Sequence, residues 1–167
     1  TEGEGDGQMK IEVLYPEIAN LYGDLMNVEF LRQSGAEVVN TGLKQTPKFI
    51  SEKIDLVYMG AMTERSQEIA VRALMPYASQ LRLAVGRGVV FFVTGNALEV
   101  FGKEIQNEDG SAIECLGLFD GVAKRDMMNR YNSIYLGKFG DMDIVGYKSQ
   151  FSHMYGAEDC RSVFETV

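Results

Sequence analysis

The expected fold of this 167-residue chain is decided by one stretch, Gly88-Val-Val-Phe-Phe-Val-Thr-Gly-Asn-Ala-Leu-Glu-Val-Phe-Gly102. Val89 to Val93 is an uninterrupted apolar run of β-forming residues, Thr94-Gly95-Asn96 has turn chemistry, and Ala97 to Phe101 can begin a helix. A strand, a tight turn and a helix in this order predict a nucleophile elbow, which lifts one side chain clear of a sheet's carboxyl edge. The exposed position carries Thr94 or Gly95, where that chemistry needs cysteine or serine.

Strands and helices alternate in the part of the chain before this stretch. Helices are expected at 25–34 and at 66–86, the first capped by Asp24 and the second kinked or divided at Pro76. The inner face of the first helix is expected to hold Met26, Phe30 and either Leu31 or Val28. Buried strands are expected at 10–15, 36–40 and 55–59, so that the alternation predicts a parallel sheet covered on both faces.

The pattern changes after Gly102. The segment from 103 to 115 reads as a β-hairpin with Asp109-Gly110 at its turn. Two further strands, 133–139 and 143–147, are expected to pair in antiparallel fashion across the turn at Gly140-Asp141. We therefore expect an α/β fold with a mainly parallel sheet, to which a hairpin and antiparallel strands are added near the C-terminus.

Composition excludes several classes of function. The net charge of −8 argues against non-specific binding of nucleic acid and against an anionic membrane surface. One histidine and two cysteines provide neither a metal cluster nor a disulfide framework, so we expect no metal and no cofactor. Without a spanning apolar run or a signal peptide, a cytoplasmic protein is expected. Residues 1–8 are expected to be a disordered tail or an artificial remnant, and 9–167 a single domain.

Three turns are expected to meet at the carboxyl edge of the sheet, where α/β proteins bind ligands. They are Tyr15 to Asn27, Gly60 to Gln67, and Thr94 to Ala97. The second turn is either half of an oxyanion hole, formed by the backbone of Gly60, Ala61 and Met62, or an ordinary loop whose Thr63 caps a helix. The candidates for a ligand crevice are Tyr22, Gly23, Asp24, Asn27, Glu64, Arg65 and Gln67. The charged residues Asp24, Glu64, Arg65 and Asp120 form either the lining of a polar crevice or a solvated salt-bridge surface.

The elbow itself, Thr94-Gly95-Asn96, has no conventional nucleophile. A threonine hydroxyl needs an adjacent base, and the only histidine is His153. A satisfied turn hydroxyl is therefore the favoured interpretation of Thr94. Cys115 and Cys160 lie outside any elbow, and each is expected to be buried or inert.

These motifs resemble those of the cobyric-acid-synthase-like class I glutamine amidotransferases, and above all the amidotransferase subunits of lipid II isoglutaminyl synthases. The opening Leu14-Tyr-Pro and Asn20-Leu-Tyr-Gly-Asp24 are similar to the start of that family. Gly60 to Gln67 resembles its oxyanion segment, with Gly60, Arg65 and Gln67 matching, and Leu116 to Asp120 and Val145-Gly-Tyr147 resemble later segments. The resemblance implies a flavodoxin-like, three-layer αβα fold and a Mur-ligase-like partner subunit in cell-wall precursor metabolism.

The departures from the family concentrate on its chemistry. The catalytic cysteine of the family falls on Thr94 when aligned from the strand, and on Gly95 when aligned from Phe101-Gly102-Lys103. The family's catalytic histidine lies in a later segment, which this chain is expected to lack. We therefore expect a glutaminase-deficient protein that retains partner or ligand binding. The alternatives are an active amidotransferase with an unconventional nucleophile, such as Cys115 or Cys160, and a stand-alone regulatory module.

Overall fold

The computed structural model describes residues 8–157, 160–161 and 165–166. The expected tail therefore lies outside the described residues except for Gln8, whose side-chain amide donates to the carbonyl oxygen of Gly35 at 2.8 Å. The chain divides into two compact units, one ending at Val100 and the other beginning at Phe101. Each unit is described by itself below. In the described part of the chain, no helix combines the length and the apolarity needed to cross a membrane.

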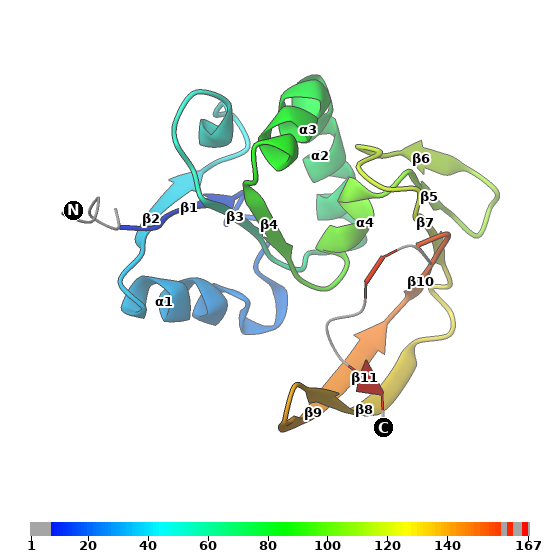
Figure 1. Cartoon of the computed structure of the whole chain (residues 1–167). Coiled ribbons are helices and arrows are strands. Elements are labelled where there is room, and N and C mark those ends of the chain that lie inside the picture. Colours follow the sequence, from blue (N-terminus) through cyan, green and yellow to red (C-terminus); the bar gives the residue numbers. More distant parts are fainter. Residues whose placement is uncertain (1–7, 158–159, 162–164, 167) are drawn as a thin grey trace. The chain divides into compact units, whose positions relative to one another are not determined.

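The first unit is built on a four-stranded parallel sheet (Figure 1). Val13 of the first strand lies beside Asn40 of the second and Tyr58 of the third, and Met59 lies beside Val93. This arrangement confirms the predicted parallel sheet. The sheet has the order β2-β1-β3-β4, with β1 at Lys10–Leu14, β2 at Glu37–Thr41, β3 at Leu56–Met59 and β4 at Val90–Val93.

Helices cover both faces of this sheet (Figure 1). One face packs Ile11, Val13 and Tyr58 against α1, Leu25–Gln33. On the other side lie α2, Glu64–Leu74, and α3, Ala78–Gly86, separated by the 3₁₀ turn η3, Met75–Tyr77. The predicted division at Pro76 is therefore confirmed. Proline removes one backbone donor and clashes with the preceding turn, so the long helix breaks there.

The predicted inner face of α1 is only partly right. Val28 is buried and Leu31 packs against the core, but Met26 and Phe30 are 68 % and 73 % exposed. Helical spacing allowed either face to point inward, and the structure turns Val28 and Leu31 toward Ile11, Val13 and Tyr58. The prediction for Met26 and Phe30 was wrong.

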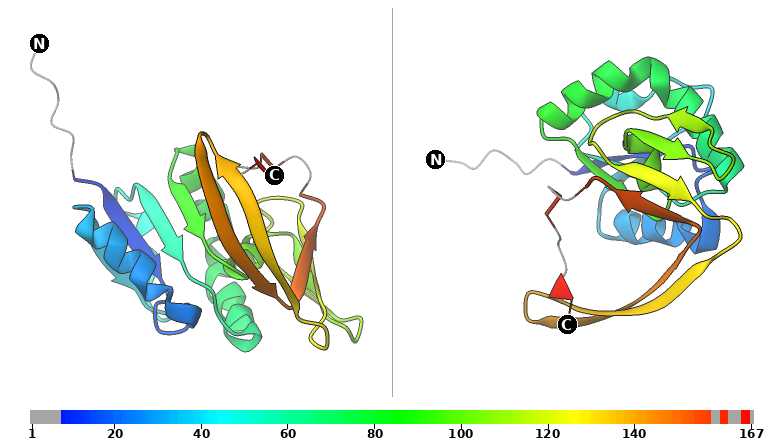
Figure 2. Two further views of the ribbon diagram at one scale, coloured as in Figure 1. Left: turned by 90° about the horizontal axis from the view of Figure 1, so that it is seen from below. Right: turned by 90° about the vertical axis from the view of Figure 1, so that its right-hand side faces the viewer.

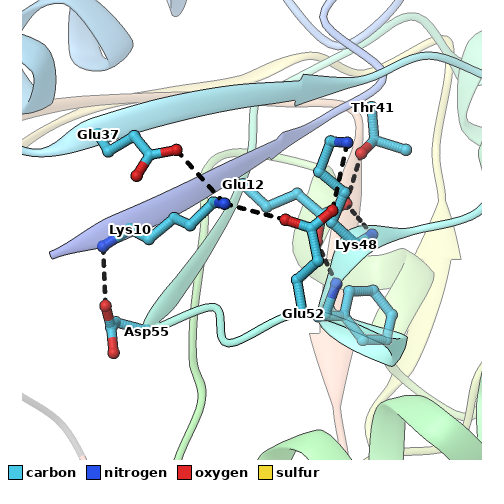
Figure 3. Close-up of polar contacts among 8 residues, drawn as sticks. Lys10, Glu12, Glu37, Thr41, Lys48, Glu52 and Asp55 are labelled. Atoms are coloured by element: carbon cyan, nitrogen blue, oxygen red, sulfur yellow. Dashed lines mark hydrogen bonds and ion pairs between the residues drawn. The ribbon is translucent and has the colours of Figure 1, made fainter.

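A buried carboxylate joins the sheet to the loop that follows β2. Glu12 is fully buried, and its Oε1 accepts from the Thr41 hydroxyl at 2.5 Å and from the Lys48 backbone at 2.6 Å. Its Oε2 accepts from the Phe49 backbone at 2.8 Å (Figure 3). These bonds hold the 3₁₀ turn η2, Lys48–Ile50, against the sheet, so the charge serves the fold.

The second unit is made of β-strands. A four-stranded sheet has the order β10-β7-β5-β6, and the predicted hairpin is its β5–β6 pair. The long antiparallel pair β8–β9, which the sequence also predicts, extends over nine residues in each strand (Figure 2). The bounds are β5 Glu104–Gln106, β6 Ala112–Glu114, β7 Val122–Arg125, β8 Tyr131–Phe139, β9 Met142–Gln150, β10 Ser152–Tyr155 and β11 Glu165–Thr166.

Candidate functional site

The three predicted turns meet at the carboxyl edge of the parallel sheet. The backbone N–H of Leu21, in the 3₁₀ turn η1 (Leu21–Gly23), donates to the carbonyl oxygen of Ala61 at 2.9 Å. Thr94 follows β4 directly and donates from its backbone to the carbonyl oxygen of Met59 at 3.1 Å. Parallel strands place their carboxyl ends side by side, which explains why segments so distant in sequence come together.

Asp24 connects all three segments. Its Oδ2 accepts from the backbone N–H of Ala61 and from the hydroxyl of Thr94, the latter at 2.8 Å. Its Oδ1 accepts from the side-chain amide of Asn27 at 3.1 Å. Asp24 occupies the N-cap position of α1, as predicted, but its carboxylate makes no capping hydrogen bond. The carboxylate instead satisfies a backbone donor and a hydroxyl at the sheet edge.

The hydroxyl of Tyr58 belongs to the same cluster, and sequence reasoning missed it. It accepts from the Asn27 amide at 3.0 Å, donates to the Asp24 carbonyl oxygen at 3.3 Å and lies 3.5 Å from the Thr94 hydroxyl. Burial raises the pKa of Tyr58, and the hydrogen bonds with Thr94 and Asn27 act in the opposite direction. The signal was present, because a tyrosine near the end of an otherwise apolar strand carries a polar group to the sheet edge.

The side chain of Asn96 links the second turn, Gly60 to Gln67, to the turn that follows β4. Its side chain accepts from the Met62 backbone N–H at 3.0 Å and donates to the Met62 carbonyl oxygen at 2.7 Å. The buried Gln67 donates from its amide to the Asn96 carbonyl oxygen at 2.7 Å and to the Glu99 carboxylate at 2.8 Å. The backbone N–H groups of Ala61 and Met62, which we expected to face a ligand, therefore already donate to side chains of this chain.

Gly60 and Gly95 leave room for these contacts. A Cβ on Gly60 would overlap the Ala19 carbonyl oxygen and would lie 3.0 Å from the Oδ2 of Asp24. A Cβ on Gly95 would lie 2.9 Å from the Cβ of Ala61. Both turns therefore need glycine for close approach, and Gly95 also for its backbone conformation.

The backbone identifies the tip of the elbow. In a working elbow the nucleophile occupies a strained conformation, which a β-branched residue avoids. Gly95 has a φ of 54°, and Thr94 is not among the described non-glycine residues with positive φ, which are Tyr15 and Tyr22. The positive φ therefore lies at Gly95, as expected if Thr94 avoids it, and glycine adopts this conformation without strain because it has no side chain.

The remaining predicted site residues differ in their exposure and in the unit that holds them. Tyr22 is 81 % exposed, Arg65 is exposed, and Glu64 sits in the first turn of α2. The second unit holds Asp120 and His153, whose Nδ1 lies 3.2 Å from the Gln150 amide nitrogen. That unit also holds the cysteines, of which Cys115 is buried and Cys160 exposed. Among the residues that the structure describes, no group of three or more His, Cys, Asp or Glu side chains is placed to hold a metal ion.

Thr94→Val is expected to lower the free energy of unfolding by about 1 kcal/mol, because Val keeps the shape but removes the donor to the Asp24 carboxylate. Thr94→Ser keeps the hydroxyl and is the matched control, for which we expect a smaller loss. Chemical denaturation followed by circular dichroism measures both. A larger loss for Thr94→Ser than for Thr94→Val would show that the methyl group of Thr94, not its hydroxyl, stabilises the turn.

Comparison with known proteins gives one curated relative and a structural neighbour of the same kind. The relative is the lipid II isoglutaminyl synthase (glutamine-hydrolyzing) subunit GatD of Staphylococcus aureus (strain N315), 23 % identical over 140 residues. The match covers 81 % of this chain and 58 % of the relative, so the chain spans little more than half of that protein's length. No family model matches the chain.

A solved crystal structure of a glutamine amidotransferase superposes with a TM-score of 0.57 at 14 % identity. It covers 81 % of this chain and 69 % of the neighbour. The resemblance to glutamine amidotransferases that the motifs predict is therefore confirmed, and so is the expected fold class.

Proposed function

We propose that this chain is a glutamine amidotransferase-like protein that does not hydrolyse glutamine and that retains a binding role. The observation that carries the proposal is the turn after β4, where Gly95 takes the left-handed conformation and offers no nucleophilic atom. Thr94, the neighbouring hydroxyl, is already a donor to Asp24. Removing the nucleophile from a catalytic unit of this kind lowers the rate by a factor on the order of 10⁶.

The second turn supports the same proposal. An oxyanion hole stabilises developing negative charge only when its backbone donors are directed at the reacting oxygen. Here the N–H groups of Ala61 and Met62 donate to Asp24 and Asn96. The Asp24 carboxylate already accepts from the Ala61 N–H, so the negative charge of Asp24 would repel a second negative oxygen beside that N–H. The two donors of this turn are therefore engaged within the chain and are not directed at a reacting oxygen.

The retained role that we propose is to bind a Mur-ligase-like subunit in cell-wall precursor metabolism, in the cytoplasm. The relative from S. aureus supports this, since its name describes it as a subunit of lipid II isoglutaminyl synthase. A stand-alone regulatory module is the alternative for the binding role. Co-purification of the chain with a ligase of that class, expressed in the same cell, distinguishes the two hypotheses. A complex of defined stoichiometry supports the ligase-bound subunit. Failure to form a complex supports the stand-alone module.

Ammonia release from glutamine is expected to stay at the level of a protein-free blank, both with and without the ligase subunit, because no thiolate stands on the elbow. The S. aureus relative, whose name describes it as glutamine-hydrolyzing, is the positive control. Release that Cys115→Ala or Cys160→Ala abolishes would instead establish the active enzyme with an unconventional nucleophile.

A further inference from the structure

The carboxylate of Asp24 lies on two donors that the parallel sheet holds in place. Its Oδ2 accepts from the backbone N–H of Ala61 and from the hydroxyl of Thr94, which we call the donor pair. Ala61 follows the end of β3 by two residues, and Thr94 follows β4 directly. The strands β3 and β4 are neighbours in the sheet, with Met59 beside Val93. Strand pairing therefore sets the spacing of the two donors.

Asp24 itself belongs to another segment, and the backbone just before it is strained. Tyr22 has a φ of 58° and Gly23 a φ of 82°, so two successive residues take left-handed conformations. This conformation is unfavourable for a tyrosine, and backbone strain of this kind concentrates at ligand sites and switches. The turn that brings the carboxylate of Asp24 to the sheet edge is thus strained, whereas the donors that it reaches follow regular strands.

The carboxylate of Asp24 also has a second favourable position. Asp24 occupies the N-cap position of α1 without making a capping bond, and the first turn of α1 holds no acid. An acidic side chain at a helix N-terminus is stabilised by the free N–H groups there and by the helix dipole. Because Asp24 is half-buried, its side chain can reach this position from the sheet edge. A carboxylate displaced from the donor pair would therefore remain stabilised.

The donors around Asp24 define the kind of anion that fits there. All are neutral: the donor pair serves Oδ2, and the amide of Asn27 serves Oδ1 at 3.1 Å. Within the described part of the chain, Asp24 forms no ion pair with a lysine or arginine. Neutral donors suit a single charge shared by two oxygens, whereas a phosphate dianion would lack a counter-charge. Gly60 provides the space, since a Cβ there would lie 3.0 Å from Oδ2.

We propose that the donor pair is a carboxylate-binding site, which Asp24 fills in the resting chain as an internal competitor of a small carboxylate ligand. The carboxylate of the ligand replaces that of Asp24, so the two negative groups never share the site. A tethered competitor acts at an effective concentration of about millimolar or more, so Asp24 keeps the site closed to dilute carboxylates. This inference rests on the proposed binding role. Ammonia release tests the loss of hydrolysis separately, so either proposal can fail alone.

Formate is the probe, because it is a bare carboxylate and fits the space that Asp24→Ala leaves. Sodium formate is expected to raise the melting temperature of the Asp24→Ala chain by about 4 °C at about ten times its Kd, relative to sodium chloride at the same ionic strength. In the NMR spectrum, the Ala61 amide resonance should return toward its wild-type position as formate binds. The wild-type chain is expected to bind formate at least about tenfold more weakly, because Asp24 competes.

Two further variants make the test specific. Glu17→Ala is the matched control: Glu17 also accepts from a backbone N–H, that of Leu43 at 2.7 Å, but it is exposed. Formate is expected to stabilise this variant no more than chloride does. Adding Thr94→Val to Asp24→Ala removes one member of the donor pair, and we expect formate to bind about fivefold more weakly.

Asp24→Ser, which can cap α1, replaces Asp24→Ala if that variant does not fold. Four results would overturn the proposal. They are Asp24 variants that formate stabilises no more than chloride, including chains that stay unfolded in formate; a wild-type chain that binds formate as tightly as they do; a stabilisation that leaves the Ala61 resonance unchanged; and an equal stabilisation of Glu17→Ala.

Discussion

Glu12→Ala is expected to lower the free energy of unfolding by about 4 kcal/mol, the largest effect of any substitution considered for this chain. The change leaves the buried N–H groups of Lys48 and Phe49 and the Thr41 hydroxyl without their acceptor. Each orphaned buried donor costs about 1–3 kcal/mol, and the truncated side chain adds a cavity beneath η2. Equilibrium denaturation followed by far-ultraviolet circular dichroism measures the change.

Glu17→Ala is the matched control for this prediction. Glu17 also accepts a backbone hydrogen bond, from Leu43 at 2.7 Å, but it is exposed, so water can replace the lost acceptor. We expect a loss below about 1 kcal/mol for this variant. If the two substitutions destabilise the protein equally, burial of the Glu12 carboxylate is not what makes it important.

Gly60→Ala is expected to destabilise the chain by about 3 kcal/mol and to displace Asp24 from the site. The new methyl group would overlap the Ala19 carbonyl oxygen, which is backbone and cannot rotate away, and would press on the Asp24 carboxylate. The amide resonances of Ala61 and Thr94 should therefore shift in the NMR spectrum, since both residues bond to Asp24.

Gly86→Ala serves as the control for the glycine effect. Gly86 lies at the end of α3, and a Cβ built there has no other atom within 4 Å among the described residues. Alanine is also the better helix former, so we expect no loss and up to about 1 kcal/mol of gain. A loss at Gly86 as large as that at Gly60 would contradict the steric explanation.

The parts of the fold that local patterns determine were predictable from the sequence. Apolar runs in the sequence indicate buried strands such as Leu56–Met59, and Pro76 predicts the break between α2 and α3. The strand Val122–Arg125 was missed, because four residues of mixed polarity give no periodicity to recognise. The inward face of α1 depends on how closely the helix approaches the sheet, which the spacing of Met26 and Phe30 does not reveal.

The position of the candidate site was predictable from the sequence, but the hydrogen bonds within it were not. Parallel strands fix where the turns near Asp24, Ala61 and Thr94 meet, so their proximity follows from the alternation of strands and helices. Which donor each carboxylate serves depends on side-chain directions that a sequence does not contain. Asp24 was expected at the start of α1 as a cap, and it instead bonds to two other segments. Glu12 likewise reads as an ordinary polar residue in an alternating strand, because its partners follow 29 to 37 positions later.

The contacts of Asp24 also have a consequence for the order in which the chain folds. They join residues that are 37 and 70 positions apart, so long loops must close before either bond can form. The pairing of β1 with β3 and of β3 with β4 brings these segments to one sheet edge, so that the bonds of Asp24 need all three strands in place. A nascent chain shorter than about Thr94 cannot form these bonds, however well its first two strands have paired.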